Sequence, residues 1–510
     1  MTASADRILT NAEVHTLADP DETAEAVAIR DGDVVRVDSA YEVGFLEGAE
    51  TDVVDLGGRV LLPGFVDAHT HLQMVGNYLV HADLSAADSP TDCVDLLAAN
   101  AADDREWILG YGFDESTWQE SRYLTREDLD AVSESRPVVA FREDMHTAAA
   151  NGVALDRLGE AMPPADVKTE GGEPTGVLVE DAVDAVYEAV EPDADEMREL
   201  LLAAQRDAHR KGVTGVHDMV RRSRAPEVYR QLELDGDLAL RVRLNYWSDH
   251  LDALEELGLR TNHGSEFVRT GGVKTFTDGS FGGRTAKLSE PYADADDETG
   301  QWVVAPDELE SFVQRADDAG FQVTAHAIGD EAIDAVLSAY EDADDPGAAR
   351  HRVEHVELAT DEHVERFAES GVVASVQPNF LKWAGEDGLY DERLGTDRRR
   401  RTNRFRDLLD AGARLAFGSD CMPMDPLLGV HHAVNAPAEA QHLSVTEALR
   451  AYTLGAAYAG FDEDRMGTVE AGKVADLVAL ERSPWEHEDA IEDVDVALTV
   501  VDGEVVHDDR

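Results

Sequence analysis

The chain contains only two cysteines, Cys93 and Cys421, among its 510 residues. Two cysteines are too few for a disulfide framework or a cysteine metal cluster, and this scarcity fits a reducing cytosol. The sequence also lacks any run of about 18 apolar residues and any apolar segment near its first residue, so we expect neither a membrane span nor a secretion signal. These absences predict a soluble, cytoplasmic protein.

Lysine is also scarce, since it supplies six of the 44 basic residues, whereas 107 acidic residues give a net charge of -63. A surface this negative repels phosphate backbones and anionic lipids, so we expect no nucleic-acid or membrane partner. The acidic residues recur along the chain, for example at 193–196, 294–298 and 341–345, and do not form a tail. This composition resembles that of cytosolic proteins from extreme halophiles, in which the acidic surface serves solvation.

Both ends of the chain show short alternating segments separated by turns, which is typical of β-strands. At the start these are residues 7–10, 26–30, 33–37 and 59–62, and at the end 475–480 and 496–501. We expect both ends to build one β-domain from residues 1–62 and 465–510.

Between these ends, an amphipathic helix, a glycine, a short β-branched strand and a polar residue follow one another repeatedly. The clearest helix and strand pairs are 195–212 with 213–218, 306–320 with 321–326, 361–371 with 372–377, and 404–412 with 413–420. Alternating α and β elements predict a parallel sheet, and their repetition favours an α/β fold with a (β/α)8 TIM barrel over 63–464. Residues from about 80 to 200 do not follow this rhythm, so we expect an insertion that lines or covers the strand ends.

The strongest local motif is residues 63–71, Pro-Gly-Phe-Val-Asp-Ala-His-Thr-His. Alternate residues of a strand share a face, so Asp67, His69 and His71 project together, and two such imidazoles can bind one metal. Hydrogen-bonded core histidines are the alternative.

Further histidines, His326 and His355, and the carboxylate of Asp420 stand at the ends of other predicted strands. Buried polar groups need partners, and a metal would satisfy all of them together. Nitrogen and oxygen ligands favour zinc, then manganese, iron, cobalt or nickel. The number of ligands is compatible with one or two divalent ions.

These motifs, with others along the chain, resemble the metal-dependent amidohydrolase superfamily, in the branch that includes N-substituted formamide deformylase. The resemblance implies a TIM barrel beside a composite β-sandwich, with His69 and His71 on one metal and His326 and His355 on a second. It also implies that CO2 carboxylates Lys274, which then bridges the ions; a neutral or ion-paired barrel lysine is the alternative. The motifs that carry the resemblance are 63–71, 112–118, 174–178, 273–280, 326–330, 354–355, 418–420 and 472–476.

The function expected from this site is hydrolysis of a non-peptide carbon-nitrogen bond, in an amide or an N-formyl or N-acyl group of a small molecule. A metal-bridging hydroxide would attack the carbonyl group, and Asp420 would act as general base and then general acid. Asp420 as a capping residue after a strand is the alternative. A deaminase, a decarboxylase or other lyase, an esterase, or a barrel that binds a ligand without turnover stays open.

Four further residues are candidates for substrate binding: Trp118, His146, Arg284 and Gln377. Each of them either shapes the pocket or only packs. The segment of His146 departs from the family pattern, because Met145 stands where a glycine is usual. The sequence specifies neither the substrate nor the oligomeric state, and a homo-oligomer stays open.

Overall fold

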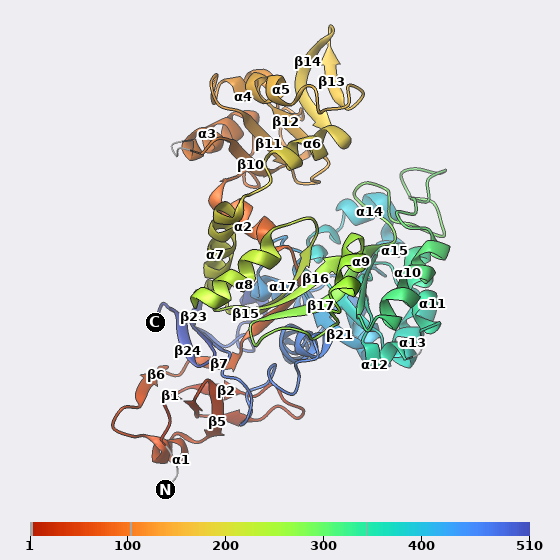
Figure 1. Ribbon diagram of the computed structural model, residues 1–510. Helices are drawn as coiled ribbons and strands as arrows, with labels where there is room; N and C mark the ends of the chain where they lie inside the picture. The colour runs from red at the N-terminus through yellow and green to blue at the C-terminus, as the bar shows by residue number, and fades with distance from the viewer. Residues whose placement is uncertain (1–3, 102–104, 344) are drawn as a thin grey trace. The chain divides into compact units, whose positions relative to one another are not determined.

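A computed structural model describes residues 4–101, 105–343 and 345–510 (Figure 1). The chain forms two compact units, of which the first contains Met1–Leu72, Gln205–Arg222 and Tyr229–Arg510. The second contains Gln73–Ala204 and Ser223–Val228. None of the helices in the described ranges is long and apolar enough to cross a membrane.

The first unit contains the predicted barrel, which is confirmed as a sheet of eight parallel strands in chain order. The edge strands β8 and β21 approach each other where the backbone N–H of Asp420 donates to the carbonyl of His69 at 2.7 Å. The strands are β8 (Phe65–Thr70), β15 (Val213–Val220), β16 (Arg241–Trp247), β17 (Val268–Phe276), β18 (Val323–Ala327), β19 (Arg352–His355), β20 (Val373–Val376) and β21 (Arg414–Phe417).

Helices connect these strands, as the pattern of helix, glycine and strand predicts. The helix α13 (Asp361–Ser370) shows the local reasons: the Thr360 side chain caps its first turn, and Gly371 ends it in the left-handed region at φ 71°. Its Val364 and Phe367 are buried, so its apolar face is covered. The other helices that precede the predicted strands are α7 (Ala194–Arg210), α10 (Pro306–Asp318) and α16 (Phe405–Ala411).

The composite β-domain is also confirmed, as two sheets with a shared apolar core in the same compact unit as the barrel. One sheet joins both chain ends, because β7 (Val60–Pro63) pairs antiparallel with β22 (Leu477–Leu480). The other members of that sheet are β2 (Glu13–His15), β3 (Thr23–Ala24), β23 (Val496–Val501) and β24 (Glu504–Asp508), and the second sheet contains β1 (Arg7–Thr10), β4 (Ala26–Arg30), β5 (Asp33–Asp38) and β6 (Asp52–Asp55). Because barrel and β-domain share a unit, the boundaries at 62 and 465 stay predictions.

The second unit overlaps the insertion predicted at about 80–200 and has a six-stranded sheet and its own apolar core. The arrangement of this insertion over the strand ends stays a prediction. Its strands are β9 (Ala82–Asp83), β10 (Ile108–Phe113), β11 (Val138–Arg142), β12 (Thr147–Ala150), β13 (Val167–Glu170) and β14 (Glu173–Val179), and its helices include α3 (Pro90–Asn100), α5 (Gly152–Leu158) and α6 (Asp181–Ala189).

Gly212, between α7 and β15, provides a test of the packing between barrel and β-domain. Its φ is 73°, and an added Cβ would lie 2.6 Å from Val478 Cγ2 and 3.1 Å from a Phe65 ring carbon. Gly212→Ala therefore adds overpacking to backbone strain, and we expect the free energy of unfolding to fall by roughly 2–4 kcal/mol. Guanidinium titration of the folded chain measures this loss.

Gly236→Ala is the matched control, because Gly236 has φ 78° but no heavy atom of the described residues lies within 4 Å of its added Cβ. We expect this variant to lose only about 1 kcal/mol from backbone strain. Equal losses in the two variants would contradict the tight contact at Gly212.

Candidate metal centre

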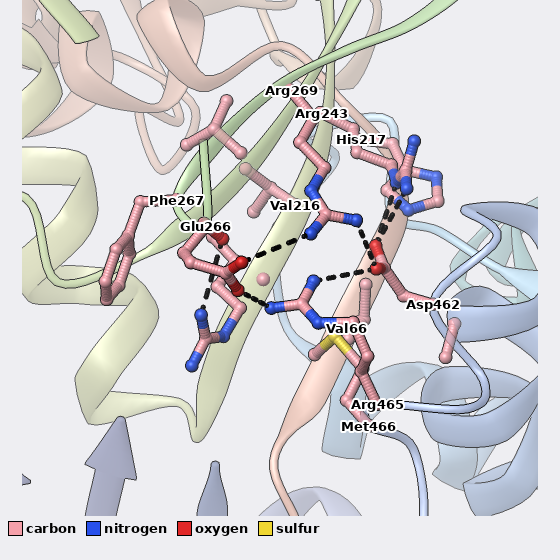
Figure 2. A pocket seen from close by; sticks show the side chains of 14 residues that line it. Val66, Val216, His217, Arg243, Glu266, Phe267, Arg269, Asp462, Arg465 and Met466 are labelled. Atoms are coloured by element: carbon pink, nitrogen blue, oxygen red, sulfur yellow. Dashed lines mark hydrogen bonds and ion pairs between the residues drawn. The ribbon is translucent and has the colours of Figure 1, made fainter. Parts of the chain in front are cut away.

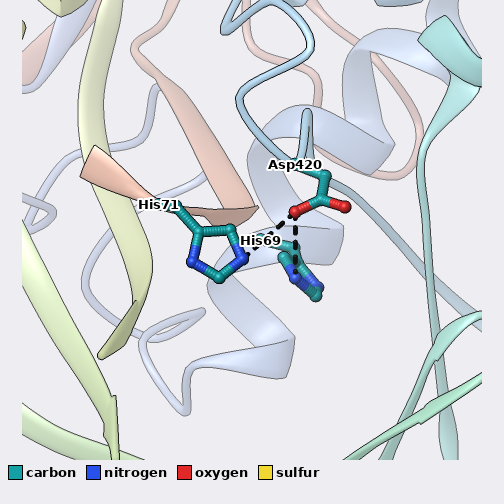
Figure 3. A group of neighbouring side chains, drawn as sticks. All are labelled: His69, His71 and Asp420. Atoms are coloured by element: carbon teal, nitrogen blue, oxygen red, sulfur yellow. Dashed lines mark ion pairs between the residues drawn. The ribbon is translucent and has the colours of Figure 1, made fainter. Parts of the chain in front are cut away.

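Three side chains meet at the carboxyl end of β8 and beyond the end of β21. The Asp420 Oδ1 atom lies 3.5 Å from His69 Nε2 and 3.3 Å from His71 Nε2. Figure 3 shows how the three side chains face one another. One potential ligand atom from each residue lies within 4.8 Å of the others. His69 is almost fully buried, whereas the His71 side chain is 34% exposed. The group therefore lies at the solvent-accessible mouth of a buried site and could hold a divalent metal.

The hydrogen bonds of these two imidazoles determine which nitrogen faces Asp420. His69 Nδ1 lies 2.6 Å from the carboxylate of Glu354, and His71 Nδ1 lies 3.2 Å from the carbonyl oxygen of Met219. Both partners accept hydrogen bonds, so each neutral imidazole carries its proton on Nδ1 and presents the Nε2 lone pair. Two lone pairs and a carboxylate oxygen then face one another with no donor between them. A divalent cation, or a proton shared between an imidazole and Asp420, would satisfy such a cluster of acceptors.

His326 and His355 continue the row of imidazoles from neighbouring strands. The His355 ring centroid lies 5.0 Å from that of His69 and 4.4 Å from that of His326. His355 Nδ1 lies 2.7 Å from the Gln377 side-chain oxygen, which leaves its Nε2 lone pair available. His326 Nε2 lies 3.1 Å from the Gly279 carbonyl, and its buried Nδ1 has no hydrogen-bond partner in the described ranges. Each of these imidazoles therefore also has one nitrogen available as a metal ligand.

Lys274 lies on β17 and is 1% exposed. Its ammonium nitrogen lies 5.3 Å from the centroid of the Phe276 ring. Burial lowers its pKa to about 8, although the charges of Glu354 and Asp420 oppose this shift. Desolvation of a buried ammonium group is costly, which favours the neutral amine. Carboxylation of Lys274 and a neutral or ion-paired lysine both stay predictions.

The electrostatics favour the neutral form of His69, His326 and His355 and the ionised form of Asp420. Burial and the charge of Lys274 lower the pKa of His69 well below the usual value, and burial and neighbouring groups do the same for His326 and His355. Burial raises the pKa of Asp420, whereas a proton or positive charge on the facing His69 and His71 nitrogens, together with the charge of Lys274, lowers it; the net pKa lies below the usual value. Neutral imidazoles and a carboxylate are the protonation states that a divalent metal requires of its ligands.

A buried ion pair inside the barrel supports His69, and its residues were not predicted to have a role. Arg352 Nε donates to Glu354 Oε1 at 2.9 Å, and Glu354 Oε2 accepts the proton of His69. Both side chains are fully buried, and Arg352 also donates to the Ala68 carbonyl and to Ser375 Oγ. The sequence offered one signal for this ion pair. Arg352 and Glu354 stand at alternate positions of the buried strand β19, so their side chains share a face.

Asp67 orients the backbone on which His69 and Asp420 stand. Its Oδ1 accepts the N–H of His69 at 3.1 Å and the N–H of Ser419 at 3.0 Å.

The backbone is unusual where ligands leave their strands: φ is 76° at His355, 51° at Val356 and 52° at Asp420. A β-branched residue at positive φ is strained, by about 1–3 kcal/mol, and such strain is concentrated at functional sites.

The four candidates for substrate binding have different surroundings. Gln377 contacts His355, and Arg284 pairs with Asp294 at 2.5 Å. Trp118 is buried in the insertion core and donates its indole N–H to the Ala87 carbonyl at 2.7 Å. His146 in the insertion is exposed and lies 3.4 Å from Glu180. These contacts give packing or pairing partners to all four, and a role in substrate binding stays a prediction.

Met145 occupies the left-handed region at φ 62°, the conformation that the usual glycine favours. Met145 therefore adopts the turn conformation that a glycine at this position would favour.

Comparison with known proteins extends over nearly the whole chain. A family model described as "Amidohydrolase family" matches residues 52–507. The protein YtcJ of Bacillus subtilis (strain 168) is 32% identical, with 97% of this chain and 98% of the relative covered. The N-substituted formamide deformylase of Arthrobacter pascens is 28% identical, with 99% and 98% covered. A crystal structure of an uncharacterized metal-dependent hydrolase from Pyrococcus furiosus has a TM-score of 0.82 at 31% identity, with 94% and 99% covered.

The contact between Glu354 and His69 generates a test of metal affinity. Glu354→Gln removes the negative charge that fixes the His69 proton and pairs with Arg352, so we expect metal affinity to fall about 10- to 100-fold. Metal retained during dialysis against graded chelator measures this change, with circular dichroism to verify folding. Glu341→Gln is the control, since it removes the same charge from a carboxylate that pairs with Arg366 away from His69. Equal metal retention in Glu354→Gln and the natural chain would refute the supporting role.

Proposed function

The chain belongs to the amidohydrolase family, and on that premise we propose that it hydrolyses an amide or N-acyl bond, an N-formyl group among them, in a small molecule. It is a metal-dependent hydrolase of carbon-nitrogen bonds, as the family match and its relatives indicate. The deformylase from Arthrobacter pascens, similar over almost its whole length, supports an N-formyl or related N-acyl group. The observation that carries the proposal is the group of imidazole lone pairs facing the Asp420 carboxylate.

The donor set suits two divalent ions, which we take to be zinc because the ligands are nitrogen and oxygen atoms without thiolates. His69, His71 and Asp420 would hold one ion, and His326 and His355 the other. The unpartnered Nδ1 of His326 supports this assignment. When bound, such ions lower the pKa of a water molecule and polarise a carbonyl group.

Lys274 would bridge the two positions as an N-carboxylated side chain. The ammonium group first loses a proton to solvent; the neutral amine then attacks CO2, a nitrogen-carbon bond forms and a second proton leaves, so the cation becomes an anion with two oxygen ligands. Burial favours the reactive neutral amine, since it lowers the pKa of Lys274 to about 8. Carboxylation also removes a buried ammonium that would repel divalent ions.

Asp420 would transfer the proton of the reaction. Its carboxylate is ionised and faces the imidazole pair, so it can accept a proton from the attacking water. It can then deliver this proton to the leaving nitrogen, which would otherwise have to depart as an unstable amide anion. The same carboxylate therefore serves first as base and then as acid.

The acidic composition supports a further proposal about the surroundings of the enzyme. A net charge of -63 with few lysines is suited to a salt-rich cytoplasm, in which counterions screen the repulsion between carboxylates. We expect the hydrolase to require concentrated salt for its stability.

Asp420→Asn tests the proton-transfer role. The amide cannot accept the proton of water, so we expect turnover of N-formyl or N-acyl substrates to fall at least about 10³-fold, whereas most of the metal is retained. Steady-state kinetics and elemental analysis measure the two effects separately. Asp334→Asn is the control on the exposed side of the barrel, where Asp334 pairs with Arg366. Near-normal turnover of Asp420→Asn would remove Asp420 from the mechanism.

Lys274→Ala tests the bridging role. We expect metal occupancy to fall, and short carboxylic acids such as acetate or propionate to restore part of it by filling the space of the lost carboxylate. Lys211→Ala is the control, because Lys211 pairs with Asp207 at 3.0 Å and lies before β15. Unchanged metal content in Lys274→Ala would rule out a carboxylated bridge.

A further inference from the structure

His217 lies inside the barrel on β15 and is 3% exposed. Its Nδ1 atom lies 2.7 Å from Nη1 of Arg352, which belongs to β19. Because β15 and β19 are not neighbours in the sheet, this contact crosses the interior of the barrel. His217 therefore links two distant strands without being one of the proposed metal ligands.

The contact with Arg352 determines which nitrogen of His217 carries the proton. A guanidinium group only donates hydrogen bonds, so Nδ1 accepts, and the proton of the neutral ring is on Nε2. Burial and the charges of Arg352 and Arg243 lower the pKa of His217 well below the usual value, which favours this neutral form. His217 is therefore an acceptor for Arg352 in the protein interior.

The guanidinium group of Arg352 uses all three of its nitrogens. Nε and Nη2 donate to the two oxygens of Glu354 at 2.9 and 3.0 Å, and Nη2 also donates to the Ala68 carbonyl and to Ser375 Oγ. In the described ranges, Nη1 has no acceptor other than His217. Loss of His217 would leave a charged, buried donor without its partner, and such a donor favours a rearrangement of the guanidinium group.

We propose that His217 is a positioning residue for the metal centre and acts on His69 through Arg352 and Glu354. Because it holds Arg352, it keeps both oxygens of Glu354 in place, and one of them, Oε2, accepts the proton of His69 Nδ1. This role rests on the proposed metal centre and extends the support of His69 across the barrel to β15.

Gly460 provides a second way to disturb His217. It follows helix α19 (Ala456–Ala459), and an added Cβ would lie 2.8 Å from His217 Nε2 and 2.6 Å from Arg243 Nε. Figure 2 shows His217 and Arg243 among the side chains that line one pocket. The φ of Gly460 is -96°, which alanine adopts without strain, so Gly460→Ala acts through its contacts with these two side chains.

The test is the affinity of the full chain for zinc, measured as the metal retained during dialysis against graded chelator. His217→Leu removes the acceptor for Arg352, and we expect affinity to fall about tenfold. His217→Asn should restore most of it, because the side-chain oxygen of asparagine can take the place of Nδ1. Gly460→Ala should lower affinity about threefold, since it displaces the imidazole.

A double variant separates positioning from a general loss of stability. Because His217 acts through Glu354, His217→Leu should lower zinc affinity by no more than about twofold in a chain that already carries Glu354→Gln. Gly110→Ala is the control for overpacking, since its added Cβ would lie 2.8 Å from side-chain atoms of Leu84 and Leu97 in the second unit. We expect this control to lose stability in guanidinium titration and to keep its zinc affinity.

Unchanged zinc affinity in His217→Leu, in a natural chain that binds zinc, would overturn the positioning role alone. An equal loss in His217→Asn and His217→Leu would overturn it too, as would the full tenfold loss in the Glu354→Gln background. A natural chain that binds no zinc would contradict the metal centre and this role together. If His217→Leu does not fold, the difference between Gly460→Ala and Gly110→Ala decides.

Discussion

The acceptor atoms that face one another at the carboxyl ends of the barrel strands are the constraint on which the rest of the structure depends. His69 and His71 donate their Nδ1 protons away from the site, so both Nε2 lone pairs point at the Asp420 carboxylate. Without a cation this arrangement is repulsive. Metal binding therefore depends on the hydrogen bonds that orient the ligands as well as on the ligands themselves.

Those hydrogen bonds extend deep into the barrel. Glu354 fixes the His69 proton and is itself held ionised, because the charges of Arg352 and Lys274 outweigh the effect of burial and keep its pKa below the usual value. A buried ion pair of this kind contributes little net stability, because desolvation offsets the attraction between the charges. Its value lies in orientation: it prevents the imidazole from reversing its tautomer. The positive φ values at His355 and Asp420 serve the same purpose, since they turn the chain so that both residues reach the site.

Much of this could be predicted from the sequence, for physical reasons. The alternation of a strand places His69 and His71 on one face, and polar residues at the ends of successive parallel strands must converge in a barrel. Partners behind the ligands could not be found this way, because the contact between His69 and Glu354 joins residues from β8 and β19, and its geometry depends on how the barrel closes. For Trp118 and His146 the sequence did not distinguish substrate binding from packing, because residues that line a pocket and residues that pack a core show the same pattern. The three arginines that pair with Asp462 are likewise visible only when β16, β17 and the segment after α19 (Ala456–Ala459) come together.

The most direct test of the central claim is the number of metal ions per chain, measured by elemental analysis on protein purified in concentrated KCl. The claim that four imidazoles, Asp420 and a carboxylated Lys274 form one binuclear centre predicts about two divalent ions per chain. Chelation should remove both, and zinc with bicarbonate should restore them. A single ion would contradict the bridged pair, and the absence of a bound ion after zinc is supplied would contradict the metal centre itself.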